Sequence, residues 1–180
     1  MTNHRLAKYL RGVTELDAID ALLSDWARER PDLEFASMAL FARLNRFVGL
    51  SNRRLEAHFQ RHGISTGEFD VLAALRRAGA PYALKPSVLA RAVMLTAAGM
   101  TGRLDKLEDQ GLVARLSNPD DRRSAPVALT KAGIRLVDKL VAGHLANEDD
   151  LFAAISGSQR AQFDRVLRTL LAALESAPTA

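Results

Sequence analysis

The chain has 180 residues and no cysteine, and its 25 Lys and Arg against 21 Asp and Glu give a formal net charge of +4 at pH 7. This length suits one globular domain or one subunit of an oligomer. The missing cysteine excludes a disulfide scaffold, a cysteine-ligated zinc site and a thiolate nucleophile. Apolar runs fall short of the roughly 18 residues that span a bilayer, and residues 1–12 lack the apolar segment of a signal peptide, so we expect a cytoplasmic protein.

The positive charge is spread along the chain instead of forming a basic arm. The surplus is +2 in residues 1–65, +2 in residues 66–130 and zero in residues 131–180. If nucleic acid is the partner, recognition must therefore come from individually placed residues and not from bulk charge.

Two amphipathic helices are predicted in the first third of the chain. Apolar residues at helical spacing predict the first over residues 14–30, where Pro31 stops it. The second is predicted over residues 35–62 and ends at Gly63.

A helix-turn-helix is predicted in the middle of the chain. The sequence Ser65-Thr66-Gly67-Glu68 has the pattern of a capping box, which predicts a helix that closes near Gly79. A short helix over residues 86–93 has proline near its first turn. Thr96 then caps a longer helix that runs to residue 110. The connection between these two helices is only about two residues long, which is typical of a helix-turn-helix.

The pattern changes to a β-hairpin after Gly111. Residues 112–116 and 125–129 are short β-like runs, and residues 117–124 between them are turn formers and charges. Thr130 is predicted to cap a long helix, and a second capping box at residues 156–159 to begin the last one. We therefore expect a mainly α protein with a small β-hairpin, a winged helix-turn-helix.

This fold gives specific candidates for DNA contacts. A recognition helix presents its N-terminal half to base edges in the major groove, and a hairpin tip can place arginine in the minor groove. The helix candidates are Thr96, Ala97, Ala98, Met100 and Thr101, followed by Arg103 and Lys106 near phosphate height, and the tip candidates are Arg122 and Arg123. The alternatives are a merely solvated tip and a Lys106 paired with Asp109 along its own helix.

A set of residues in the middle of the chain forms a specific motif: Leu104, Leu107, Gly111-Leu112-Val113 and Arg115, then Asp121 and Arg123-Ser124, then Leu129-Thr130 and Gly133. This motif resembles that of the MarR family of transcriptional regulators. The resemblance implies a homodimer that binds a palindromic operator, with Asp121 orienting the arginines of the wing or recognition helix. It also implies dimerisation helices in residues 1–65 and 131–180 around a DNA-binding lobe in residues 66–130.

The apolar stripes of the first and last helices favour the dimer independently, because the winged core offers little surface to cover them. The alternative is that these helices fold back on the core of their own subunit.

A second set of residues carries a narrower resemblance: Ser24-Asp25-Trp26-Ala27-Arg28, Asp70-Val71-Leu72, Arg103 and Arg115. These residues resemble the urate-responsive branch of this family, which implies a ligand site formed by Trp26, Asp70, Arg103 and Arg115. A tryptophan ring can pack on a flat purine anion, and two arginines can bind its oxygen atoms. The alternatives are a dimer-core Trp26, a plain Asp70–Arg103 salt bridge, an Arg103 that contacts phosphate, and a phenolic or citrate-like anion as the ligand.

Other classes of function have weaker support. His58 and His62 have the i, i+4 spacing of a metal pair, but the sequence places no third ligand beside them, so we expect surface or interface histidines and no metal or cofactor. No phosphate-binding loop or nucleophile elbow is present, which argues against an enzyme. The prediction is therefore a DNA-binding repressor that a small anion such as urate releases. The alternative is a helical interaction module without specific DNA binding.

Overall fold

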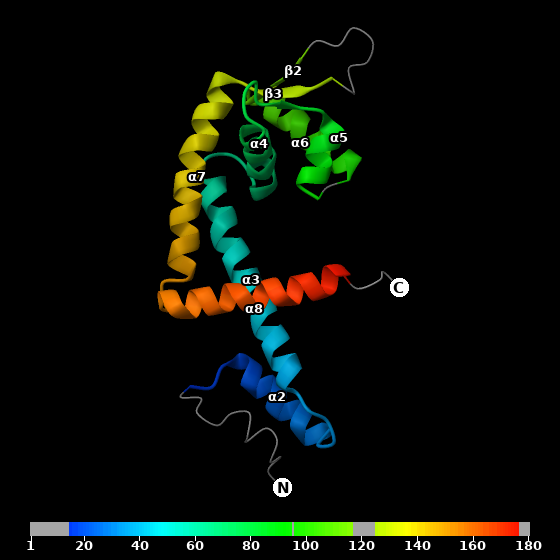
Figure 1. Ribbon diagram of the computed structural model, residues 1–180, viewed down its shortest axis with the longest axis vertical. Helices are drawn as coiled ribbons and strands as arrows, with labels where there is room; N and C mark the ends of the chain where they lie inside the picture. Colours follow the sequence, from blue (N-terminus) through cyan, green and yellow to red (C-terminus); the bar gives the residue numbers. More distant parts are fainter. Residues whose placement is uncertain (1–14, 95, 117–124, 177–180) are drawn as a thin grey trace. The chain divides into compact units, whose positions relative to one another are not determined.

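The computed structural model describes residues 15–94, 96–116 and 125–176, and the chain divides into two compact units, Met1–Arg54 and Leu55–Ala180. The first unit holds α2 (Ala18–Glu29) and most of α3 (Ala36–Gln60), whose last turn belongs to the second unit. The other elements are α4 (Thr66–Arg77), β1 (Ala83–Leu84), α5 (Pro86–Ala92), α6 (Ala97–Asp109), β2 (Val113–Arg115), β3 (Val127–Leu129), α7 (Lys131–Leu151) and α8 (Gly157–Ser176) (Figure 1).

A small core and an ion-paired cap hold the first unit together. Leu23, Ala27, Phe35 and Ala39 are buried between α2 and α3. Asp17 caps α2, and the Arg43 guanidinium of α3 contacts Asp17 at 2.9 Å and the buried Asp20 at 2.5 Å. The helix predicted over residues 14–30 therefore begins later than expected, because Asp17 supplies its cap.

The sheet of the second unit has three antiparallel strands. β3 lies between β1 and β2, so that Ala128 is paired with Ala83 on one side and Ala114 on the other. The predicted hairpin strands are confirmed, but β1 was missed because two residues carry no periodic pattern. This third strand joins the segment before α5 to the base of the wing.

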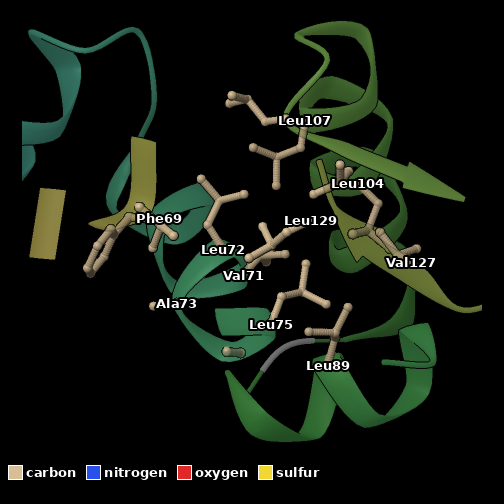
Figure 2. Close-up of a cluster of buried hydrophobic side chains, with 14 of the residues drawn as sticks. Phe69, Val71, Leu72, Ala73, Leu75, Leu89, Leu104, Leu107, Val127 and Leu129 are labelled. Atoms are coloured by element: carbon tan, nitrogen blue, oxygen red, sulfur yellow. The ribbon is translucent and has the colours of Figure 1, made fainter. Parts of the chain in front are cut away.

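The core of the second unit lies between the helices of the lobe and the sheet. Figure 2 shows Leu72 and Leu75 of α4 pointing toward Leu104 and Leu107 of α6. The side chains of Val127 and Leu129 of β3 belong to the same cluster. All of these side chains are at most 1% exposed except Leu129 at 8%. This core fixes α6 against α4 and the sheet.

The capping residues predicted from sequence are in place. The side chains of Thr96 and Thr130 accept hydrogen bonds from the amides of Gly99 (3.2 Å) and Gly133 (3.0 Å). Thr130 also donates to the carbonyl oxygen of Gly111 at 2.7 Å. The Ser156 side chain accepts from the Gln159 amide at 3.3 Å, and the Gln159 side chain accepts from the Ser156 amide at 2.8 Å.

The last helix, α8, has an unburied apolar face. None of its residues is buried, and five of its large apolar residues are 36% to 73% exposed: Phe163, Val166, Leu170, Leu171 and Leu174. Among the described residues, no helix combines the length and apolar character needed to cross a membrane.

Candidate nucleic-acid interface

The helix-turn-helix consists of α5, a short turn and α6. The turn begins at Val93 and includes Met94, which has a positive φ of 52° and is 94% exposed. Leu89 of α5 and Leu104 of α6 belong to the same buried cluster. The predicted helix-turn-helix is therefore packed as one unit with the lobe.

One face of α6 is committed to the core. Met100, Leu104 and Leu107 follow i, i+4, i+7 spacing and are at most 1% exposed. The prediction that Met100 contacts DNA is wrong, because its side chain packs inside the lobe. The apolar spacing that Met100 shares with Leu104 and Leu107 is the sequence signal that could have identified this inward position.

The N-terminal half of α6 retains exposed candidates for base contacts. Thr96 and Thr101 are exposed. Ala97 and Ala98 lie in the first turn of the helix, but their side chains are outside the described residues, as are residues 117–124 with Asp121, Arg122 and Arg123. The wing contacts therefore stay a prediction.

Lys106 is engaged with α4. Its Nζ lies 2.7 Å from Oε1 of Glu68, whose side chain is only 4% exposed. Burial alone would raise the pKa of Glu68, but hydrogen bonds from Lys106 and from the backbone and hydroxyl of Ser65 hold the pKa below its usual value. Lys106 thus pairs across helices, and not with Asp109 as the local alternative proposed.

Arg103 also points to α4. Its Nη1 donates to the carbonyl oxygen of Gly67 at 3.3 Å, and a Cβ on Gly67 would overlap the guanidinium. Desolvation raises the pKa of Asp70, an effect that the longer-range attraction of Arg103 partly offsets. Arg103 therefore acts on Asp70 through space, while its hydrogen bond goes to backbone.

Arg115 of β2 is held by the recognition helix. Its guanidinium contacts Asp105 at 2.6 Å and also bonds Glu108, and its backbone N–H donates to Glu108 at 3.1 Å. The hydrogen bond to Asp105 is the main reason that the pKa of Arg115 is raised. The wing strand is thereby clamped to α6.

Trp26 lies on α2 in the first unit. Its ring is 45% exposed and stacks on Phe35 with centroids 6.4 Å apart. It lines an open hollow of about 430 Å³ together with Leu22, Asp25 and Glu29. Both carboxylates contact Arg28, at 2.9 and 3.4 Å. The hollow itself therefore offers an anion a ring face beside two carboxylates.

His58 was expected at a surface or interface but is buried. It is 8% exposed and packs against α7, where a Cβ on Gly143 would overlap its ring. Its ring centroid is 5.7 Å from that of His62. The described residues hold no group of three side chains able to bind a metal ion.

Sequence reasoning missed the partners of these cations. Glu68 was recognised only as part of a capping box, and Asp105, Glu108 and Gly67 were not singled out. Glu108 and Asp105 sit three residues apart on α6, which places them on one face. That spacing can be recognised in the sequence. The pairing of Lys106 with Glu68 joins two different helices, so no sequence spacing predicts it.

Comparison with known proteins decides the family. The chain is 36% identical to the HTH-type transcriptional regulator PecS of Dickeya dadantii over 170 residues, which cover 94% of this chain and 96% of PecS. The chain belongs to the MarR family of transcriptional regulators. The MarR family model matches residues 62–124, the segment that contains the helix-turn-helix of this MarR-family protein.

Solved structures of MarR-family proteins share the fold. AbsC of Streptomyces coelicolor superposes with a TM-score of 0.69 at 20% identity, covering 81% of this chain and 98% of AbsC. BpsR of Bordetella bronchiseptica, whose DNA binding is regulated by 6-hydroxynicotinic acid, superposes with a TM-score of 0.59 at 25% identity, covering 71% of this chain and 98% of BpsR. The predictions of a winged helix-turn-helix and of a DNA-binding transcriptional regulator, and not an enzyme, are confirmed.

Proposed function

We propose that the protein is a homodimeric repressor that binds a palindromic operator in the cytoplasm and is released by a small flat anion such as urate or a related purine. The observation that carries this proposal is the 36% identity to PecS along 94% of the chain. The exposed Thr96 and Thr101 are consistent with it, because they stand at the end of the recognition helix that reaches base edges.

The apolar face of α8 supports the homodimer. Leu170, Leu171 and Leu174 are 51%, 55% and 73% exposed, and such a contiguous apolar face is unfavourable in water. A second copy offers the same face and can bury it by symmetry. In the proposed dimer, the helices in residues 1–65 and 131–180 join the subunits, and residues 66–130 bind DNA.

For the effector, we propose a site that uses Trp26, Asp70, Arg103 and Arg115. Arg103 and Arg115 supply guanidinium groups for the anion, and Trp26 supplies a half-exposed ring face for a planar ligand. The raised pKa of Asp70 favours its neutral, protonated form, and this form repels an anion less strongly than the carboxylate does. BpsR, whose ligand is a flat heteroaromatic acid, supports this class of effector. A phenolic or citrate-like carboxylate is the alternative ligand.

DNA binding is tested by a gel shift with the intergenic DNA beside the gene and with random DNA. We expect specific binding that weakens steeply with salt. A footprint of the complex should show protection of two half-sites roughly 10 bp apart. Equal affinity for both DNAs would contradict the repressor and favour the helical interaction module.

The effector is tested by thermal shift and gel shift with urate, xanthine, 6-hydroxynicotinate and citrate. We expect urate or xanthine to raise the unfolding midpoint and to release DNA. Arg103→Gln and Trp26→Ala should abolish the release, whereas the control Arg135→Gln on the exposed side of α7 should not. If only citrate or 6-hydroxynicotinate stabilises the protein, a purine is excluded as the effector and the alternative, a different small anion, is favoured.

The dimer is tested by sedimentation of wild type and Leu170→Glu. We expect the wild type to sediment as a dimer, and the variant to dissociate because its charge would be buried in the interface. A monomeric wild type would contradict the homodimer.

A further inference from the structure

Three side chains from one face of α6 extend to residues 63–68, which are the end of the α3–α4 connection and the first turn of α4. Positions 103, 106 and 110 share that face because they are spaced i, i+3, i+7. The contacts are Arg103 to the carbonyl oxygen of Gly67 at 3.3 Å, Lys106 to Glu68 at 2.7 Å and Gln110 to the carbonyl oxygen of Gly63 at 3.1 Å. The recognition helix is thus tied to residues 63–68 by polar contacts, beside its apolar core face.

Glu68 is the centre of these contacts. Its Oε2 accepts a hydrogen bond from the Ser65 amide at 2.7 Å, while its Oε1 faces the Lys106 ammonium. The carboxylate lies in the first turn of α4, where the helix dipole also favours a negative charge. Its side chain is 4% exposed, so Lys106 replaces much of the water that the charge has lost.

The same segment is bonded to the end of α3. Glu56 accepts hydrogen bonds from the Thr66 amide at 2.8 Å and from the Thr66 hydroxyl at 2.6 Å. Thr66 precedes Gly67, on which the Arg103 guanidinium lies. A continuous polar path therefore runs from the last turn of α3 through residues 63–68 to α6.

We propose that residues 63–68 are a latch that sets the orientation of α6, with Glu68 and Lys106 as its positioning pair. Lys106 then serves operator binding by holding the recognition helix, and not by neutralising a phosphate. This inference rests on the sequence-specific DNA binding proposed above. It deepens that function by naming what aligns the reading helix.

The burial of Glu68 favours this role over a phosphate contact. If the Lys106 ammonium moved to a phosphate, the Glu68 carboxylate would stay buried without its cation. The Lys106 side chain itself is 56% exposed, so the cost of its leaving lies on the Glu68 side: a buried carboxylate that loses its cation costs more than an exposed ion pair contributes. Lys106 is therefore expected to stay on Glu68 when the protein binds DNA.

The first test measures affinity for a duplex that the wild type selects from a random-sequence pool, and for unselected duplex. We expect Lys106→Met and Glu68→Gln each to weaken binding to the selected duplex roughly tenfold. Binding to unselected DNA and the salt slope should not change, because no phosphate contact is lost. The double variant should be no weaker than either single variant, and Lys106→Arg should restore affinity.

Two outcomes would overturn the latch. One is a Lys106→Met variant that loses affinity equally for both DNAs and has a salt slope smaller by about one, as a phosphate contact predicts. The other is additive loss in the double variant. Lys139→Met on α7 is the matched control, since it makes the same substitution at an exposed lysine of another helix.

The second test needs no DNA. We expect amide hydrogen exchange in residues 63–68 and 103–110 to be faster in full-length Glu68→Gln than in the wild type, and exchange in α7 to be unchanged. Equal exchange in both proteins would overturn the latch. If the wild type selects no duplex, the proposed DNA-binding function is contradicted. The latch is still tested in that case, because the exchange measurement does not need DNA.

Discussion

The Arg115 guanidinium of β2 lies 2.6 Å from the Asp105 carboxylate of α6. Glu108 of the same helix also bonds this guanidinium, so one cation is shared by two carboxylates. An effector anion at Arg115 must therefore compete with carboxylates that already occupy it. Binding of the anion to Arg115 therefore weakens the contacts that hold β2 to α6. Through these contacts the proposed effector acts on the DNA-binding helix.

We predict that Asp105→Asn sensitises the protein to its effector. The substitution removes one competing charge while it keeps the size of the side chain. Because Asp105 is 54% exposed, its ion pair is worth at most about 1 kcal/mol, so the effector concentration for half-release of DNA should fall by up to about fivefold. A gel-shift titration with urate measures this concentration.

The control is Asp109→Asn, which removes a carboxylate from the same exposed helix end. It should leave the half-release concentration close to that of the wild type. An Asp105→Asn variant that requires more urate would show that the clamp assists the effector instead of opposing it.

We predict that Gly133→Ala strongly destabilises the lobe. A Cβ at position 133 would overlap the carbonyl oxygen of Leu112, which is backbone and has no rotamer by which to move aside. Overpacking of this kind costs about 1–3 kcal/mol. Urea unfolding monitored by circular dichroism measures the loss.

Gly157→Ala is the matched control for this prediction. Gly157 is also near the start of a helix, but nothing lies within 4 Å of its added Cβ. Its stability should equal or slightly exceed that of the wild type, because alanine favours the helix. Equal stability of both variants would mean that β2 and α7 can separate without cost.

The sequence predicted those parts of the fold that local chemistry determines. Thr96, Thr130 and Ser156 cap their helices as expected, because an N-cap needs only a hydroxyl at the right place along the chain. The strand β1 could not be predicted in this way. It consists of Ala83 and Leu84, and it is defined by pairing with β3, which lies more than forty residues later.

For the candidate site, the sequence singled out cations but not the groups that they contact. Arg103 and Arg115 were predicted to bind a ligand, and in the structure both contact acceptors in the lobe. Their acceptors come from other elements, which a sequence does not bring together. Met100 was predicted to contact DNA because it lies in the N-terminal half of α6, yet the helical period turns it inward beside Leu104.

We predict that the latch makes the protein less stable in acid. The folded-state pKa of Glu68 lies below its usual value of 4.5, so unfolding takes up a proton at that site. The stabilisation is complete above about pH 4.5 and is lost as the pH falls through the folded-state pKa. Glu56, whose pKa is lowered chiefly by Thr66, acts with the same sign.

Unfolding midpoints at near-neutral pH and below pH 4.5 measure this effect. Glu68→Gln should be less stable than the wild type near neutrality, and the difference should shrink below pH 4.5. A Glu56→Gln variant should show the same trend. A difference that grows in acid would have the wrong sign and would contradict the ionised state of Glu68.

We predict that Trp26 reports effector binding directly. It is the only tryptophan of the chain, and its ring is 45% exposed. Packing of a purine on that ring should change its emission during a titration with urate, with free N-acetyltryptophanamide as the control for absorption by the ligand. Trp26→Phe keeps a ring and should weaken effector release by up to about tenfold, whereas Trp26→Ala should abolish it. Emission that tracks the free tryptophan control would remove Trp26 from the site, and the two arginines would then have to bind the anion without a ring.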